Sequence, residues 1–218
     1  MDFKKATFVK ELKGRFLGEV ILENIKVNCY ISNSSHLSNI LDITNKLVLL
    51  KTNKGNNLRT KYTLQAVNYD NTYLLLNLNY LNNIFGNFLE KKDLVIKREY
   101  IVHGYKTDYY ILNENKIIEI KGVLSANKTA IYTFKKHNRA YLQLKKIKDL
   151  LKLGYKVDYN FILLNPKIEN IKLEDKRIKE NRLFIECIQL GMNVNFYKSV
   201  WCKNDFKILA YNIKKNFW

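Results

Sequence analysis

The chain has 218 residues, of which 47% are hydrophobic and 27% charged, a composition typical of a globular protein and unlike that of a disordered one. No apolar run approaches the roughly 18 residues of a membrane span, and the charged amino end has no apolar segment of the kind found in secretory signals. We therefore expect a cytoplasmic protein without a membrane partner.

Charge is the strongest global feature, since 38 Lys and Arg face 20 Asp and Glu and give a net charge of +18. Such an excess favours a polyanionic partner, nucleic acid before an anionic membrane surface. The chain is also rich in Asn, Ile and Tyr, as AT-rich coding produces, and that bias raises the lysine content regardless of function. The charge therefore supports nucleic-acid binding without establishing it.

Cysteine and histidine usage excludes two classes of site. The three cysteines, Cys29, Cys187 and Cys202, form no C-x-x-C pair and leave an odd number, so the sequence indicates neither a disulfide framework nor a zinc site. The three histidines are scattered without metal-ligand spacing. We expect buried free thiols, which agree with the cytoplasm.

The first part of the chain is predicted to be an all-β barrel of the OB type. Short alternating or apolar runs are separated by Asn, Ser, Gly and Asp, which is the strand-and-turn pattern. A brief helical link is expected at 35–41. The predicted strands are 15–22, 25–31, 46–52, 61–67 and 72–78.

The helical spacing of apolar residues over 79–92 interrupts this pattern, so we place a domain boundary there. The predicted domains are residues 1–82, the barrel, and residues 83–218, an α/β domain. The second domain begins with a strand over 94–102.

Strands and helices alternate through the rest of the chain, which predicts a layered α/β domain with a mixed central sheet. Gly154 and Gly191 are natural helix ends. After the segment 106–122, the predicted elements are a helix over 135–154, a strand over 156–165, a helix over 175–191, and strands over 193–201 and 206–213.

The segment "KTDYYILNENKIIEIKG", residues 106–122, places charges among tyrosines and isoleucines. Glu119 and Lys121 are two residues apart, so on a strand they share one face. A tight hairpin centred between Glu114 and Asn115 would put Asp108 opposite Lys121. The two acids and the lysine are then expected to converge.

Such a cluster has two readings. Two neighbouring carboxylates bind a hard cation such as Mg²⁺ or Mn²⁺, which activates water and neutralises charge on a phosphate, while a lysine orients water or pairs with the phosphate. That is the chemistry of phosphodiester hydrolysis. The alternative is a cross-strand salt bridge between Asp108 and Lys121, worth about 0 to 1 kcal/mol if exposed.

The pattern "TDYYIL…KIIEIKG" resembles the metal-binding hairpin of PD-(D/E)xK nucleases, and its surroundings resemble the sugar fermentation stimulation protein family. The order and spacing of several stretches carry this resemblance over most of the chain: "GRFLGEVIL", "YTLQAV", "LLNLNYLNNIF", "IKREYIVHG", "DYYIL", "IEIKG" and "HNRAYLQLKKIKDLLKLGYK". The resemblance implies an OB-fold barrel followed by a restriction-endonuclease-like domain, in a protein that binds DNA.

Carried over residue by residue, the resemblance implies roles for individual side chains. Asp108 and Glu119 would be metal ligands, with Glu99 as a further acid, and Lys121 would be the motif lysine. Arg139 on the following helix would contact phosphate. Glu99 is equally well read as a surface strand residue and Arg139 as a solvated helix position.

Two positions depart from the family pattern. Thr107 stands where the superfamily has its proline, and Gln143 stands where the family's helix has a histidine. Gln143 could still contact substrate, but its presence weakens the case for activity more than the case for binding.

The barrel carries a second set of candidate nucleic-acid contacts. Its basic side chains could follow a phosphate backbone while a tyrosine ring stacks on a base, as in OB-folds. The ring of Tyr62 could equally belong to the core. The candidates are Arg15, Lys51, Lys54, Arg59, Lys61 and Tyr62.

The sequence thus supports two functions: a DNA-binding protein with a magnesium-dependent nuclease site, or a non-catalytic, regulatory DNA-binding module. It does not decide between DNA and RNA, between strand forms, or between a monomer and a homodimer.

Overall fold

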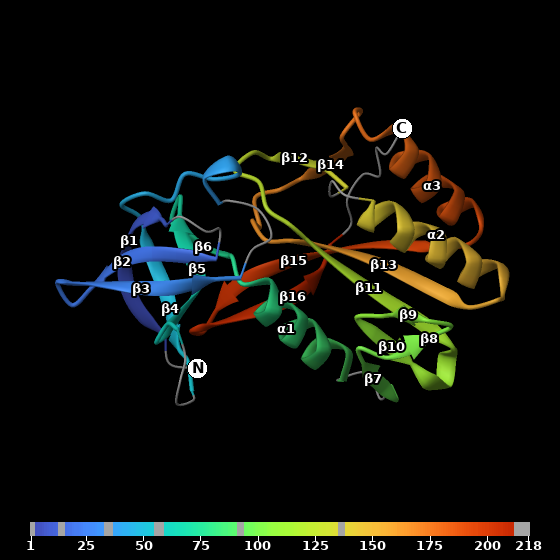
Figure 1. Cartoon of the computed structure of the whole chain (residues 1–218), viewed down its shortest axis with the longest axis horizontal. Helices are drawn as coiled ribbons and strands as arrows, with labels where there is room; N and C mark the ends of the chain where they lie inside the picture. The colour runs from blue at the N-terminus through green and yellow to red at the C-terminus, as the bar shows by residue number, and fades with distance from the viewer. Residues whose placement is uncertain are drawn as a thin grey trace.

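The structure is a computed structural model that describes residues 3–12, 16–32, 37–54, 59–90, 94–134 and 138–211. It contains a β-barrel beside a mixed α/β sheet that carries helices on both faces (Figure 1).

The barrel closes because its third and fifth strands pair in parallel. Neighbouring strands follow the order β3-β2-β1-β4-β5, and the β3–β5 pairing joins the two ends of this series. This is the order of an OB-type barrel. The strands are β1 (Lys4–Glu11), β2 (Leu17–Leu22), β3 (Ile25–Ile31), β4 (Leu47–Thr52) and β5 (Tyr62–Tyr69), with the short 3₁₀ helix η1 (Leu37–Asn39) between β3 and β4.

The predicted barrel is confirmed in type, but the first predicted strand, 15–22, is the second strand of the structure, β2, because β1 was not predicted. β1 was missed because its lysines disguise an alternating pattern, in which Ala6 and Phe8 point into the core. The last predicted run becomes β6 (Thr72–Leu75), which pairs with β5 outside the closed barrel.

The second sheet has the strand order β16-β15-β13-β11-β10-β7. Its centre is parallel, because β11, β13 and β15 run in one direction, and both flanks are antiparallel. The strands are β7 (Ile96–Arg98), β10 (Tyr109–Ile111), β11 (Lys116–Val123), β13 (Lys156–Leu163), β15 (Asn193–Cys202) and β16 (Asp205–Ala210). The edge strand β7 has three residues, and its Lys97 and Arg98 are exposed.

Helices cover both faces of this sheet (Figure 1). α1 (Leu78–Glu90) packs on one face, beside Ile118 and Ile120 of β11. α2 (Arg139–Lys152) and α3 (Ile178–Gln189) lie on the other face. Within the described part of the chain no helix is long and apolar enough to cross a membrane.

Two small sheets were not predicted. β12 (Thr129–Tyr132) pairs in parallel with β14 (Asn170–Leu173). β8 (Ile101–Val102) and β9 (Tyr105–Lys106) form a short hairpin. The predicted strand 94–102 therefore ends early, because Glu99 adopts a φ of 48°, in the left-handed region that breaks a strand.

The barrel and the α/β sheet share one apolar core. Leu49, Ala66 and Leu75 face outward from the barrel and pack in one cluster with Leu81 of α1 and Ile120 of β11. The proposed boundary between residues 82 and 83 falls inside α1, which belongs to this shared core. The two parts are therefore held in a fixed relation.

Candidate functional site

The site forms on β11, at the face of the sheet covered by α2. Glu119 and Lys121 point to this face, while Ile118 and Ile120 point to the core under α1. The separation of polar and apolar faces that the sequence predicts is thus present. Glu119 is 1% exposed, so its carboxylate lies almost entirely out of solvent.

The hairpin register differs from the prediction. η2 (Leu112–Glu114) and Asn115, at a φ of 52°, make a longer connection than a tight turn. Tyr109 consequently pairs with Ile118, and continuing this register by one residue brings Asp108 opposite Glu119 rather than Lys121. The predicted Asp108–Lys121 pairing is wrong, because the connection shifts the strands by two residues.

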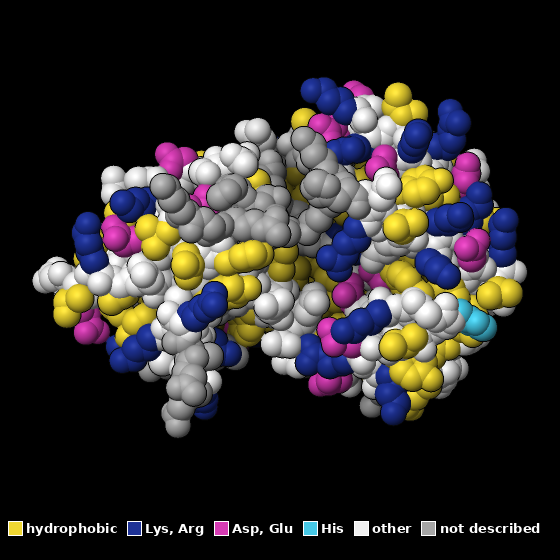
Figure 2. Space-filling model, in the orientation of Figure 1, with side chains coloured by type: hydrophobic (Ala, Val, Ile, Leu, Met, Phe, Trp, Pro, Cys, Tyr) yellow, Lys and Arg dark blue, Asp and Glu magenta, His cyan; other side chains and the backbone are white. Residues whose placement is uncertain are grey.

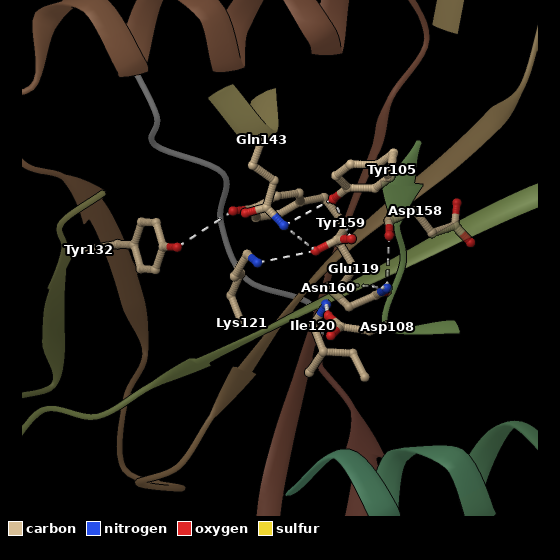
Figure 3. Close-up of polar contacts among 10 residues, drawn as sticks. All are labelled: Tyr105, Asp108, Glu119, Ile120, Lys121, Tyr132, Gln143, Asp158, Tyr159 and Asn160. Carbon is tan, nitrogen blue, oxygen red and sulfur yellow. Dashed lines mark hydrogen bonds and ion pairs between the residues drawn. The ribbon is translucent and has the colours of Figure 1, made fainter. Parts of the chain in front are cut away.

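Three donors surround the Glu119 carboxylate (Figure 3). Tyr105 donates its hydroxyl to Oε1. Lys121 Nζ lies 3.1 Å from Oε2, and Gln143 Nε2 donates to the same oxygen over 2.7 Å. Gln143 Nε2 also lies 2.9 Å from the Tyr105 hydroxyl, so β9, β11 and α2 meet at one carboxylate.

Asp108 is held separately from this network. Its Oδ2 accepts a hydrogen bond of 2.8 Å from the backbone N–H of Ile120. Side chains directly opposite each other on one face of an antiparallel pair have Cβ atoms about 5 Å apart, and like charges there are destabilising. Asp108 and Glu119 therefore create a local excess of negative charge that Lys121 only partly offsets.

The protonation states follow from burial and from neighbouring charges. Burial raises the pKa of the Glu119 carboxyl; Lys121 lowers it, and Asp108 raises it further. Burial lowers the pKa of Lys121, but the charges of Glu119 and other neighbours, with the hydrogen bond to Glu119, together outweigh it, so this pKa lies above its ordinary value. Burial raises the pKa of Tyr105, which keeps its hydroxyl protonated and able to donate.

Tyrosines complete the walls of the site. Tyr132 of β12 and Tyr159 of β13 place their hydroxyl oxygens 3.5 Å apart, and the Lys121 ammonium lies 5.6 Å from the centre of the Tyr159 ring. Asn160 donates to the backbone carbonyl of Glu119 over 3.1 Å. Sequence reasoning missed Tyr105, Tyr132, Tyr159 and Asn160, because only the folded sheet brings these distant residues to β11.

The other predicted acid does not join the pair. The backbone of Glu99 pairs with that of Asp108 on the neighbouring segment, since the Glu99 N–H donates to the Asp108 carbonyl over 3.0 Å. Its side chain is 72% exposed and pairs with Lys106 at 2.8 Å. In the described ranges no three Asp, Glu, His or Cys side chains lie close enough to hold one metal ion.

The predicted nucleic-acid contacts occupy several places. Arg139 begins α2 and is exposed, while Gln143, one turn later, faces the carboxylate. On the barrel, Lys54, Arg59 and Lys61 are exposed, and Lys51 is partly buried. Arg15 lies outside the described residues.

Tyr62 belongs to the barrel core. Its ring is 6% exposed and packs with the other apolar residues inside the barrel. A base cannot stack on a ring that is covered by protein, so the prediction of Tyr62 as a stacking residue is wrong in this structure and the core alternative holds.

The donor set of the site fits a hard divalent cation. Carboxylate oxygens are the ligands that Mg²⁺ prefers, and it uses one or two of them, with waters and phosphate oxygens as the remaining ligands. Asp108 and Glu119 supply two carboxylates from adjacent strands, and the charge excess between them is what a cation would offset. Asp108 and Glu119 are thus the residues that would hold it.

Comparison with known proteins bears on the fold. No protein-family model matches the chain. Over 165 residues the chain is 28% identical to a sugar fermentation stimulation protein homolog of Thermosipho melanesiensis, covering 75% of this chain and 73% of the relative. The structure of Pyrococcus furiosus SfsA in complex with Ca²⁺ superposes with a TM-score of 0.78 at 18% identity, covering 97% of this chain and 94% of that one. The chain is thus similar in sequence to one sugar fermentation stimulation protein homolog and in fold to another protein of that name.

The fold predicted from the sequence is therefore confirmed, with an OB-like barrel followed by a mixed α/β domain. Both similarities agree with the predicted family, which stays a prediction. That the archaeal family member was solved with Ca²⁺ shows that a protein of this fold was studied with a divalent cation bound. The roles of individual residues in the present chain stay predictions.

Proposed function

We propose that this chain is a member of the sugar fermentation stimulation protein family, and that it is a cytoplasmic DNA-binding protein with a divalent-cation site for phosphodiester hydrolysis. One observation carries the proposal: the β10–β11 register puts Asp108 opposite Glu119, and the Lys121 ammonium lies 3.1 Å from the Glu119 carboxylate. Two carboxylates that can bind a metal ion and a lysine ammonium on the same face are the groups that a metal-dependent phosphodiesterase needs.

Each residue has a distinct part in this proposal. Asp108 and Glu119 would hold the cation, which would lower the pKa of a coordinated water and offset charge on the phosphate. Lys121 neutralises part of the carboxylate charge, and as a point charge it also attracts the phosphate. The burial of this face by α2 and β9 excludes bulk water, which strengthens each of these interactions.

The surroundings of the site are suited to a polyanion. Figure 2 shows Lys and Arg side chains over both parts of the molecule, with many on the part that carries α2 and α3. The exposed cations of these two helices are Arg139, Lys145, Lys146, Lys152, Lys179 and Arg182. Arg139 begins the helix whose Gln143 reaches Glu119, so a bound phosphate backbone would pass close to the site.

The test of catalysis is cleavage of single-stranded and branched DNA in Mg²⁺ or Mn²⁺. We expect cleavage by the wild type, loss of cleavage in Glu119→Gln, and unchanged cleavage in the control Glu169→Gln. Glu169 is a matched acid that pairs with Lys128 on the surface, outside the Glu119 network. Cleavage that persists in Glu119→Gln would show that the reaction occurs elsewhere.

A second candidate is a non-catalytic, regulatory DNA-binding module. It is favoured by the hydrogen bonds that occupy the Glu119 carboxylate, which leave it engaged without any metal. This function predicts DNA binding in EDTA, no cleavage, and an affinity that falls steeply with salt because each neutralised phosphate releases counterions. An affinity equal at low and high salt would contradict both candidates.

A further inference from the structure

The carboxylate of Glu119 is engaged by two neutral side chains from outside its own sheet. Tyr105 comes from the β8–β9 hairpin and Gln143 from α2, and both donate to it. We propose that these two are positioning residues that regulate cation loading at Asp108 and Glu119. This inference rests on the proposed metal site.

The physical reason is competition for the same lone pairs. A carboxylate has about four acceptor positions, and Glu119 uses three of them for Tyr105, Lys121 and Gln143. A hard cation binds through those same oxygens. A cation that binds both carboxylate oxygens of Glu119 must therefore displace a hydrogen bond. Burial makes this displacement costly, because water cannot take the place of the lost partner.

The two donors act together because they also contact each other. Gln143 Nε2 lies 2.9 Å from the Tyr105 hydroxyl and 2.7 Å from Glu119 Oε2, so the three side chains form a closed triangle. Asp108 is outside this triangle, with its Oδ2 bound to the Ile120 N–H. Control of loading therefore falls on Glu119, which accepts from three side chains, whereas Asp108 accepts one backbone N–H.

The hairpin that carries Tyr105 is fixed to the main sheet. β8 and β9 pair in the register of β7 and β10, and backbone hydrogen bonds from Glu99 to Asp108 and from Thr107 to Tyr100 join the two pairs. The Tyr105 side chain is 7% exposed and packs in the core of the α/β sheet. The hairpin therefore holds the Tyr105 hydroxyl at Glu119, as a positioning residue requires.

The experiment measures Mn²⁺ affinity of the full-length protein by isothermal titration calorimetry. Tyr105→Phe removes only the competing hydroxyl, so Mn²⁺ should bind about tenfold more tightly, at the lower end of what a hydrogen bond to a charged group contributes. Tighter binding distinguishes this role from a structural one, because a damaged site binds its cation more weakly. Unchanged or weaker binding in Tyr105→Phe would overturn the proposal.

Controls separate this inference from the proposed function. Tyr155→Phe removes a tyrosine hydroxyl that contacts the same hairpin but not Glu119, so its affinity should match the wild type. Should Tyr105→Phe not fold, Gln143→Met removes the second donor from a partly exposed helix position and should likewise tighten binding.

Glu119→Gln should lose Mn²⁺ binding. If that variant binds Mn²⁺ like the wild type, the assigned metal site is wrong and this inference falls with it. If Glu119→Gln loses binding but Tyr105→Phe and Gln143→Met bind no more tightly than the wild type, the metal site stands and only the regulatory role is overturned.

Discussion

At the scale of single residues, the contact between Lys121 and Glu119 joins two largely buried charges. The carboxylate is 1% exposed and the lysine side chain 21% exposed, so the pair lies mostly out of water. Removing one partner of such a pair leaves an uncompensated charge, which costs far more than the intact pair contributes.

We therefore expect Lys121→Met to lower the free energy of unfolding at pH 8 by about 3 kcal/mol, measured by urea denaturation. The double variant Glu119→Gln, Lys121→Met should recover part of that loss, because it removes both charges. A double variant less stable than Lys121→Met would contradict this account.

The pH dependence of the Lys121→Met variant follows from the Glu119 carboxyl. Burial raises its pKa above the ordinary value of 4.5, so the folded state binds this proton more tightly than the unfolded state. The destabilisation should be full above the folded pKa and fade as the pH falls through it toward 4.5. Urea denaturation at several pH values checks this.

The thiols provide another prediction at this scale. Burial raises the pKa of Cys29 and Cys187 to about 12, whereas Cys202 is only partly buried. Because the thiolate is the reactive form, one thiol should react rapidly with Ellman's reagent at pH 8 in the native protein, and three in guanidinium. Rapid reaction of two or more native thiols would contradict the described core.

Spacing was enough to place Glu119 and Lys121 on one face, because alternation on a strand brings residues two apart to the same side, whereas Asp108 was predicted to lie opposite the wrong residue. Spacing was not enough to find Tyr105 or Asn160. These contacts depend on which strands become neighbours, and no local pattern contains that information. Tyr62 was misassigned for a related reason, because a tyrosine at a strand start is compatible with either face until the barrel closes.

At the scale of elements, the contact between α1 and β10 depends on a glycine. A Cβ at Gly86 would lie 2.2 Å from the Tyr109 hydroxyl oxygen, which donates to the Asn82 carbonyl of the same helix over 2.8 Å. The absence of a side chain at Gly86 allows the helix to approach the strand.

Gly86→Ala should consequently lower the thermal unfolding midpoint, measured by circular dichroism, although Gly→Ala inside a helix normally stabilises by about 1 kcal/mol. Asn87→Ala, on the exposed side of the same helix, is the matched control and should leave the midpoint nearly unchanged or raise it. A Gly86→Ala protein more stable than the wild type would show that α1 is not packed this closely.

Helices whose apolar residues recur at a regular spacing were predictable from the sequence. Strand registers and strand ends that depend on the geometry of a turn were not. α2 and α3 were predicted as helices that end near Gly154 and Gly191, and the structure has both, with Leu144 and Ile147 of α2 buried. The hairpin register was wrong because η2 and the left-handed Asn115 lengthen the connection. The break at Glu99 gives no sequence signal, since glutamate rarely adopts a positive φ.

At the scale of the whole molecule, the shared core couples the barrel to the α/β sheet. Leu75 of β6, the strand that pairs with β5 of the barrel, is fully buried in the cluster that also contains residues of α1 and β11. The Trp201 ring lies 5.0 Å from that of Tyr73 in β6, so it reports on the junction of the two parts.

Unfolding should accordingly be a single cooperative transition, with tryptophan fluorescence and far-ultraviolet circular dichroism coinciding along a urea titration. Leu75→Ala should shift both transitions together by about 3 kcal/mol. Leu209→Ala, which truncates a leucine that is 52% exposed, should shift neither. Two separated transitions would indicate that barrel and sheet unfold independently.

The short edge strand β7 has a consequence for crowded conditions. An unpaired strand offers its backbone to a second molecule, and long flat edges of this kind lead to aggregation. β7 presents three residues, and two of these, Lys97 and Arg98, are exposed cations. When two copies of the protein approach each other through this edge, their exposed cations repel before the backbones can pair. The protein should therefore resist fibril growth from this side even at high concentration.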